Sequence, residues 1–178
     1  MEEQSGNRLQ VNWRYFPLEQ VNSAEGPDWK LWEQPDSHRS RGRPAFQAAI
    51  AARKQGDEAF RRFHLALLRA KHEQGQDHGK QKTLLAVAEE VGLDREAFER
   101  DMSDRSLLPV IGEDYTEARE RVGVFGTPTF VFPNGEAIYV KLKPAPPKGD
   151  AVALFEQLLA IGRDRPFVLE WKRPTKPE

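Results

Sequence analysis

The chain has 178 residues, of which 31% are charged and 38% hydrophobic, and its net charge is −1 at pH 7. This length predicts one domain, or one domain with an inserted subdomain. A near-zero net charge creates no field that would draw the chain to nucleic acid or an anionic membrane, so neither partner is expected. The sequence has no cysteine, which excludes disulfides, thiolate metal sites and thiol catalysis by these residues.

The N-terminal segment is polar, and no run of about 18 apolar residues occurs that could span a bilayer. Residues 1–6 lack the basic and apolar regions of a secretory signal, so a cytoplasmic location is expected. The composition of residues 2–7 predicts the end of a helix, and a polar, unstructured start is the alternative. Apolar and polar residues then alternate over Leu9–Phe16, which predicts a strand that ends at Pro17.

Residues 21–43 have the composition of a loop that contains Trp29 and Trp32. The two tryptophans could line a ligand cleft, but we expect them to pin a long loop to the body of the protein. Residues 38–43 form a short basic run. It could contact phosphate, but a solvated loop is the expectation at this net charge.

Four helices are predicted between residues 44 and 103, which together indicate a compact helical subdomain. Pro44 opens the first, where its missing N–H costs nothing, and Gly56 ends it. Asp57 is the predicted N-cap of the second, whose apolar residues recur at three- and four-residue steps. Those residues are Ala59, Phe60, Phe63, Leu67 and Ala70.

The third helix is expected over residues 80–91. Gly92 closes it and Leu93 makes the hydrophobic cap contact. Asp94 is the predicted N-cap of the short fourth helix. After this subdomain, Pro109 interrupts an apolar run at 107–112, and a further helix is predicted over residues 113–122.

A β-hairpin is predicted near the C-terminal end. The β-branched and aromatic run 129–132 reads as one strand, Asn134-Gly135 is a strong turn signal, and residues 137–140 form the return strand. Residues 150–161 have one apolar face and predict a last helix. Two remaining segments are a stiff proline-rich spacer at 144–147 and a short extra strand or extended tail at 167–171, with disorder expected over 172–178.

The sequence Gly-Thr-Pro-Thr-Phe before this hairpin resembles the cis-proline loop of the thioredoxin superfamily. Residues 118–124 and the stretch WRYFPLEQ at 13–20 resemble the DsbA branch, in particular its cytoplasmic FrnE-like members with a helical insertion. The resemblance covers about residues 8–162. It implies an α/β, thioredoxin-like fold with an inserted helical subdomain. The implied parts are residues 1–43 and 104–165 for the thioredoxin-like domain, 44–103 for the insertion, and 166–178 for an extra strand and tail.

The resemblance also implies a function, protein-disulfide oxidoreduction, but one part of the pattern is absent. The family's first strand and its Cys-x-x-Cys helix should precede Trp13. We therefore expect an N-terminally truncated oxidoreductase whose catalytic cysteines lie outside these residues, so no catalytic residue is assigned. One alternative is a redox-inactive module that binds a peptide or partner. The other is an enzyme like the kappa-class glutathione transferases and 2-hydroxychromene-2-carboxylate isomerases.

The expected substrate-binding residues are Gly126, Thr127 and Pro128. A cis proline would leave the N–H and C=O of Thr127 free to pair with an extended peptide. A trans proline that merely begins a strand is the alternative. The implied partners are a protein or peptide with a thiol or disulfide, a small thiol such as glutathione, and a second copy of the chain in a homodimer. No cofactor is expected.

The four histidines do not predict a metal site. His64 and His72 lie about two helical turns apart, but zinc takes three or four ligands and no carboxylate spacing completes the set. His38 and His78 show no such spacing either.

The missing first strand has a predicted structural consequence. In the resembled fold it lies between the strands at 9–16 and 129–132, so both would expose unpaired N–H and C=O groups. Each buried unpaired group costs about 1–3 kcal/mol. Residues 1–178 alone are therefore not expected to form a well-behaved monomer with an intact sheet, while the helical subdomain should persist. The alternative is direct pairing of the two strands.

Overall fold

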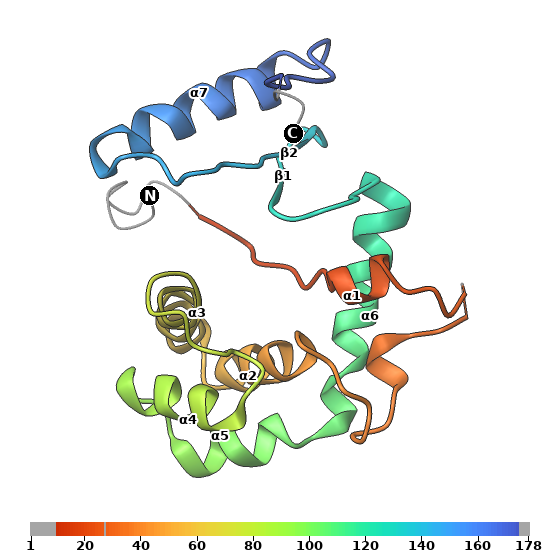
Figure 1. The fold of residues 1–178 in the computed structure, drawn as a ribbon, viewed down its shortest axis with the longest axis vertical. Coiled ribbons are helices and arrows are strands. Elements are labelled where there is room, and N and C mark those ends of the chain that lie inside the picture. The colour runs from red at the N-terminus through yellow and green to blue at the C-terminus, as the bar shows by residue number, and fades with distance from the viewer. Residues whose placement is uncertain (1–9, 27, 175–178) are drawn as a thin grey trace. The chain divides into compact units, whose positions relative to one another are not determined.

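The computed structural model describes residues 10–26 and 28–174 (Figure 1). Internal contacts divide the chain into two compact units. Residues 14–117 make up the first, here called the helical unit. Residues 10–13 and 118–174 are the described part of the second, here called the hairpin unit. In the described ranges, no helix has the length and apolar character needed to cross a membrane.

Four helices form the core of the helical unit, as the sequence predicted. The side chains of Phe63 and Phe98 are fully buried at its centre, with ring centroids 5.3 Å apart. All five apolar positions predicted for the second helix are buried. Three alanines of the first helix have no exposed surface, which lets its neighbours approach closely. The helices are α2 (Arg43–Lys54), α3 (Asp57–His72), α4 (Gln81–Glu90) and α5 (Arg95–Met102).

The end of α4 and the start of α5 follow the predicted capping chemistry. Gly92 has a φ of +71°, and Leu93 after it is buried and donates its N–H to the Ala88 carbonyl at 3.0 Å. The Asp94 carboxylate accepts the Ala97 N–H at 2.9 Å, as an N-cap does. Both predictions are confirmed.

The predicted N-cap of α3 was wrong by one residue. Gly56, with a φ of +112°, occupies the cap position, and no side chain accepts a hydrogen bond there. The positive φ at Gly56 places Asp57 inside the first helical turn, where a negative charge is favourable but its carboxylate makes no capping hydrogen bond.

The helix after the subdomain, α6 (Pro109–Thr116), begins where the sequence suggested an interruption. A proline at the first helical position loses no hydrogen bond, so Pro109 starts this helix rather than breaking it. A 3₁₀ turn (Arg105–Leu107) precedes it and a π-helical turn (Glu117–Val122) follows. The helix predicted over 113–122 was therefore wrong in its start.

Trp32 pins the long loop to the body of the helical unit, as expected. An added Cβ on Gly112 of α6 would lie 2.5 Å from the Trp32 indole, so glycine is what admits this ring. Trp29 packs edge-on against His38, with centroids 5.7 Å apart. The Gln20 amide also holds the loop, since it donates to the Trp29 carbonyl and accepts the Leu31 N–H. Helix α1 (Leu18–Val21) precedes the loop, and a 3₁₀ turn (Leu31–Glu33) lies within it.

One residue of the basic run is not solvated, contrary to expectation. Arg43 is buried, and its guanidinium donates to the Gln34 and Pro35 carbonyls at 2.7 and 3.0 Å. Arg41, two residues earlier, is exposed. The run therefore combines an anchor with a free cation.

The strand predicted over Leu9–Phe16 is not formed in its described part. Residues 10–16 have no strand pairing, and direct pairing with residues 129–132 does not occur among the described residues. Ladder hydrogen bonds need a neighbouring strand, and the segment satisfies its backbone differently. Tyr15 donates its N–H to Asp114 Oδ2 at 2.9 Å, and Arg14 Nη1 donates to Asp114 Oδ1 at 2.8 Å.

The hairpin unit contains the predicted hairpin and last helix. Strands β1 (Thr129–Val131) and β2 (Ala137–Tyr139) pair antiparallel with Phe130 opposite Ile138. Gly135, with a φ of +87°, lies in the five-residue connection 132–136 that joins them. The last helix is α7 (Ala151–Asp164), which follows a 3₁₀ turn (Lys148–Asp150). The tail at 167–171 has no strand, and the predictions for residues 1–9 and 175–178 lie outside the described ranges.

Helix α7 packs on one face of the hairpin. The Phe130 and Phe155 ring centroids lie 5.8 Å apart. Gly162 meets Ile138 so closely that an added Cβ would lie 2.5 Å from its Cδ1 atom. The Asn134 amide donates to the Arg163 carbonyl at 2.9 Å, which ties the turn to the helix end. This packing fixes which face of the hairpin is covered.

Candidate functional site

The Gly126–Pro128 loop enters the hairpin from a fixed point. Val124 is buried, and its N–H donates to the Ala118 carbonyl at 2.9 Å. The Arg119 guanidinium in turn donates to the Val124 carbonyl at 2.9 Å. These bonds hold the chain against the preceding π-helical turn, so the loop is positioned by its neighbours.

Gly126 lies beneath a tyrosine ring. It is buried, and a Cβ there would lie 3.1 Å from Cε2 of Tyr139. The Thr129 hydroxyl donates to the Gly126 carbonyl at 2.7 Å. Of the three predicted binding residues, Gly126 therefore supports the loop, whereas Thr127 and Pro128 are exposed.

Thr127 and Pro128 differ in their backbone hydrogen bonding. The peptide bond between them is cis. The Pro128 carbonyl accepts the Val140 N–H at 3.1 Å, which extends the hairpin ladder by one pair. Within the described ranges, neither the N–H nor the C=O of Thr127 forms a backbone hydrogen bond.

The ladder shows which edge of β1 is open. Pro128 and Phe132 bond toward β2, since Phe132 donates its N–H to the Glu136 carbonyl at 2.8 Å. Successive residues of a strand direct their backbone polar groups to opposite edges. The N–H and C=O groups of Thr129 and Val131 therefore point away from β2. No other described strand pairs with them.

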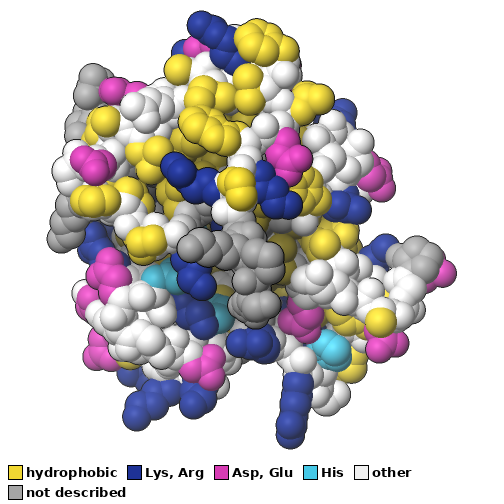
Figure 2. Space-filling view, turned by 45° about the horizontal axis from the view of Figure 1, so that its top comes forward, with side chains coloured by type: hydrophobic (Ala, Val, Ile, Leu, Met, Phe, Trp, Pro, Cys, Tyr) yellow, Lys and Arg dark blue, Asp and Glu magenta, His cyan; other side chains and the backbone are white. Residues whose placement is uncertain are grey.

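One face of the hairpin beside this edge is apolar and exposed. Phe130 faces α7, so Val131 lies on the opposite face of β1, and Tyr139, opposite Thr129, lies on that face too. Phe125 adds a ring whose centroid is 5.1 Å from that of Tyr139, and its side chain is 63% exposed. Figure 2 shows many hydrophobic side chains at the molecular surface. The edge at residues 127–131 thus combines open backbone groups with apolar side chains.

The sequence could have shown this apolar surface. Alternation along residues 129–131 and 137–139 places Val131 and Tyr139 on one face once the turn fixes the register. The predicted binding residues were those of the loop alone, and Phe125, Val131 and Tyr139 were not predicted.

The histidines do not gather into a metal centre. No group of three or more His, Cys, Asp or Glu side chains suited to a metal occurs in the part of the chain that the structure describes. His64 stacks on Phe60 with centroids 5.4 Å apart. Burial, and then the positive charge of Arg53, lowers the pKa of His64 to about 4. Its ring is therefore neutral at pH 7.

Comparison with known families gives one match. A family model described as a DSBA-like thioredoxin domain matches residues 1–147. A search among curated proteins found no match. The match covers most of the chain and, with the mixed α/β structure, confirms the expected thioredoxin-like fold with a helical insertion.

Proposed function

This chain belongs to the DSBA-like thioredoxin family, and we propose that it is the substrate-binding part of a protein-disulfide oxidoreductase. Its role is to hold an extended polypeptide along the open edge of β1. The observations that carry the proposal are the outward N–H and C=O groups of Thr129 and Val131 and, next to them, the Thr127 N–H and C=O, which form no backbone hydrogen bond in the described ranges. An extended peptide satisfies such groups by adding a strand.

Backbone hydrogen bonds give affinity for a peptide of any sequence, and contacts with side chains add selectivity. Alternate residues of the bound peptide would lie beside Phe125, Val131 and Tyr139. These side chains favour a peptide whose alternate residues are apolar, as in the interior segments of an unfolded protein.

Disulfide exchange at the bound peptide needs a thiolate that these residues do not contain. In exchange, a thiolate forms a bond to one sulfur of the disulfide, and the other sulfur leaves as a thiolate. The attacking thiolate is supplied by cysteines outside residues 1–178 or by a small thiol such as glutathione. The chain's own contribution is to hold the peptide in register.

Residue-resolved amide exchange tests peptide binding. Addition of a reduced, unfolded polypeptide should slow exchange at Thr127, Thr129 and Val131. Exchange at Phe130 and Phe132 should change little, because their amides already face β2. Slowing without this alternation along the strand would contradict the proposal.

Two proline variants give a matched control. Val131→Pro removes an outward donor from the open edge of β1, whereas Ala137→Pro removes an outward donor from the far edge of β2. Neither removes a bond between the strands. Val131→Pro should weaken peptide binding about fivefold to tenfold, as expected for one lost hydrogen bond, and Ala137→Pro should leave it unchanged.

The second candidate is a redox-inactive binding module, which the absence of cysteine favours. The DNA upstream of Met1 separates the two functions. In-frame codons for Cys-x-x-Cys would favour the oxidoreductase, and a close in-frame stop would favour the binding module. Both candidates predict peptide binding at the same edge. The amide-exchange experiment therefore tests peptide binding, and the upstream DNA distinguishes the two functions.

A further inference from the structure

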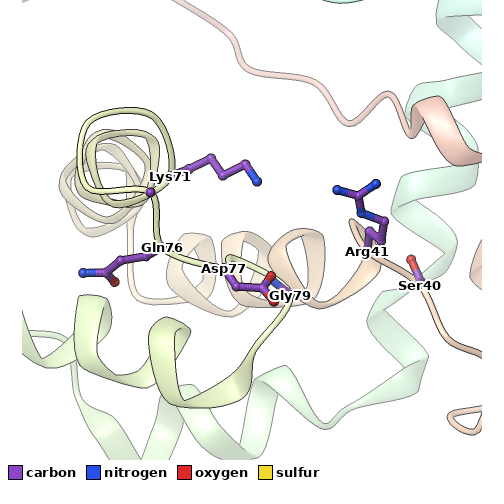
Figure 3. Close-up of a pocket in the computed structure, with 7 residues that line it drawn as sticks. Ser40, Arg41, Lys71, Gln76, Asp77 and Gly79 are labelled. Atoms are coloured by element: carbon purple, nitrogen blue, oxygen red, sulfur yellow. The ribbon is translucent and has the colours of Figure 1, made fainter.

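A second site lies in the helical unit, where an open pocket of about 310 Å³ is formed (Figure 3). The end of α3 and the following loop form one side, and the loop before α2 forms the other. This size is at the lower end of pockets that hold small molecules, about 300–1,000 Å³. The lining residues are Ser40, Arg41, Lys71, Gly75, Gln76, Asp77 and Gly79.

Two cations face this pocket from opposite sides. In Figure 3 the ammonium group of Lys71 and the guanidinium of Arg41 extend toward the same space. Neither side chain forms an ion pair with any residue in the described ranges. Two like charges that converge without an anion repel each other, which an anionic ligand would relieve.

The acid that lines the pocket is occupied by its own loop. The Asp77 carboxylate accepts the Gly79 N–H at 3.0 Å and lies 4.0 Å from the Lys80 ammonium. These contacts, and foremost the Gly79 N–H, lower the pKa of Asp77. The Asp77 carboxylate forms no ion pair with Arg41 or Lys71 in the described ranges, and its charge acts on Lys71 only through space. One negative charge therefore offsets only part of the positive charge of the two cations.

The pKa of a nearby histidine, His78, indicates that the electrostatic potential at the site is positive. Burial lowers the pKa of His78, and the charge of Lys71 lowers it next, with Arg41 and His72 contributing while Asp77 opposes. The groups around this ring therefore act on it mainly as cations.

The Arg41 side of the pocket is held in place. The Ser40 hydroxyl donates to the Glu19 carboxylate at 2.7 Å and accepts the Arg43 N–H at 2.9 Å. A Cβ on Gly79 would lie 3.2 Å from the Arg41 carbonyl, so glycine lets the two loops meet. A cation on a fixed loop loses little freedom when a ligand binds.

We propose that this pocket binds the phosphate group of a small molecule, with Arg41 and Lys71 as its ligands. Guanidinium matches two phosphate oxygens at once, and ammonium serves as a point charge. The pocket is larger than one phosphate ion, so a phosphate ester fits it as well. The site lies in the other unit from the peptide edge and does not depend on that proposal.

The test is a titration with inorganic phosphate at constant ionic strength, followed through the amide resonances of Gly75 and Gly79. Phosphate should shift both, and chloride at the same ionic strength should not. Arg41→Ala and Lys71→Ala should each weaken binding about tenfold, as expected for a lost charge-assisted bond. Lys82→Ala, which removes an exposed cation from α4, is the matched control and should have no effect.

A variant that is expected to strengthen phosphate binding complements the two alanine variants. Asp77→Asn keeps an oxygen that can accept the Gly79 N–H but removes the negative charge, so phosphate should bind several-fold more tightly. Glycerol 3-phosphate separates the sources of the phosphate group: tighter binding than inorganic phosphate indicates an ester, and equal binding indicates the free ion. Equal shifts with chloride, or unchanged binding in both alanine variants, would overturn the proposal.

Discussion

The helical unit and the hairpin unit differ in how far their large apolar side chains are exposed to solvent. Phe63, Leu84 and Phe98 have no exposed surface, whereas Phe125 and Val131 at the hairpin are 63% and 53% exposed. Helices satisfy their own backbone hydrogen bonds, so four of them can enclose a core with contacts close in sequence. A two-stranded sheet needs further strands or a second layer to do so. Similar apolar patterns therefore give a closed core in one unit and an uncovered surface in the other.

The largest effect that would test this contrast is removal of a core ring. Phe98→Ala should lower the free energy of unfolding by about 3–5 kcal/mol, because it leaves a cavity against Phe63. Phe130→Ala, in the hairpin unit, should cost only about 1 kcal/mol because that ring is half-buried. Urea unfolding of both variants, followed by circular dichroism, measures the difference. An equal cost would show that the hairpin unit has a comparable core.

The next effect concerns how tightly α7 packs on the hairpin. Gly162→Ala should cost about 1–3 kcal/mol, since the new Cβ would overlap the Ile138 side chain. Thermal unfolding and amide exchange in residues 129–139 would measure it.

Two further variants test the cause. Adding Ile138→Ala to Gly162→Ala should recover part of the stability, because it removes the overlapped atoms. Gly149→Ala, where no atom lies within 4 Å of a new Cβ, should be neutral. A full loss in the double variant would mean that the helix backbone, not the contact, is affected.

A pH effect should be confined to the helical unit. The pKa of His64 is about 4 in the folded chain and about 6.5 when unfolded. The unfolded state therefore binds the extra proton between these values, and stability is lost as pH falls from 6.5 to 4. The loss should be about 1–2 kcal/mol, since the ring is partly screened by solvent. Unfolding free energies across this range should flatten in His64→Phe and keep their slope in His72→Gln.

The smallest effect distinguishes two aspartates at helix starts. Asp94→Ala should cost about 1 kcal/mol because it removes the hydrogen bond to the Ala97 N–H. Asp57→Ala should cost only a few tenths, because that carboxylate interacts with the helix dipole alone. Chemical unfolding resolves this difference, and equal costs would show that Asp57 caps α3 in solution.

The predictions from sequence succeeded where contacts are local. Spacing of three and four residues identified the buried face of α3, and Asn134-Gly135 located the hairpin. The strand over residues 9–16 was wrong because pairing depends on a distant neighbour that alternation does not reveal. Pro109 was misread because a proline that starts a helix and one that interrupts it look alike without the preceding turn.

Of the two candidate sites, only the one formed by residues close in sequence was predicted. The loop at Thr127 and Pro128 was predicted from a continuous pattern, and its binding role stays a prediction. The phosphate pocket was not predicted. Arg41 belonged to a run that was expected to be solvated, and Lys71 lies thirty residues later on another helix. Their convergence depends on how the loops after α3 and before α2 meet.

The bonds from Arg14 and Tyr15 to Asp114 bring the start of the helical unit close to its end, three residues before Glu117. A polypeptide whose two ends lie close together in space can be inserted at a single surface site of another protein. The two host residues that flank the insertion then stay close together, so the host fold is not strained. The carboxylate of Asp114 therefore makes residues 14–117 a transplantable module.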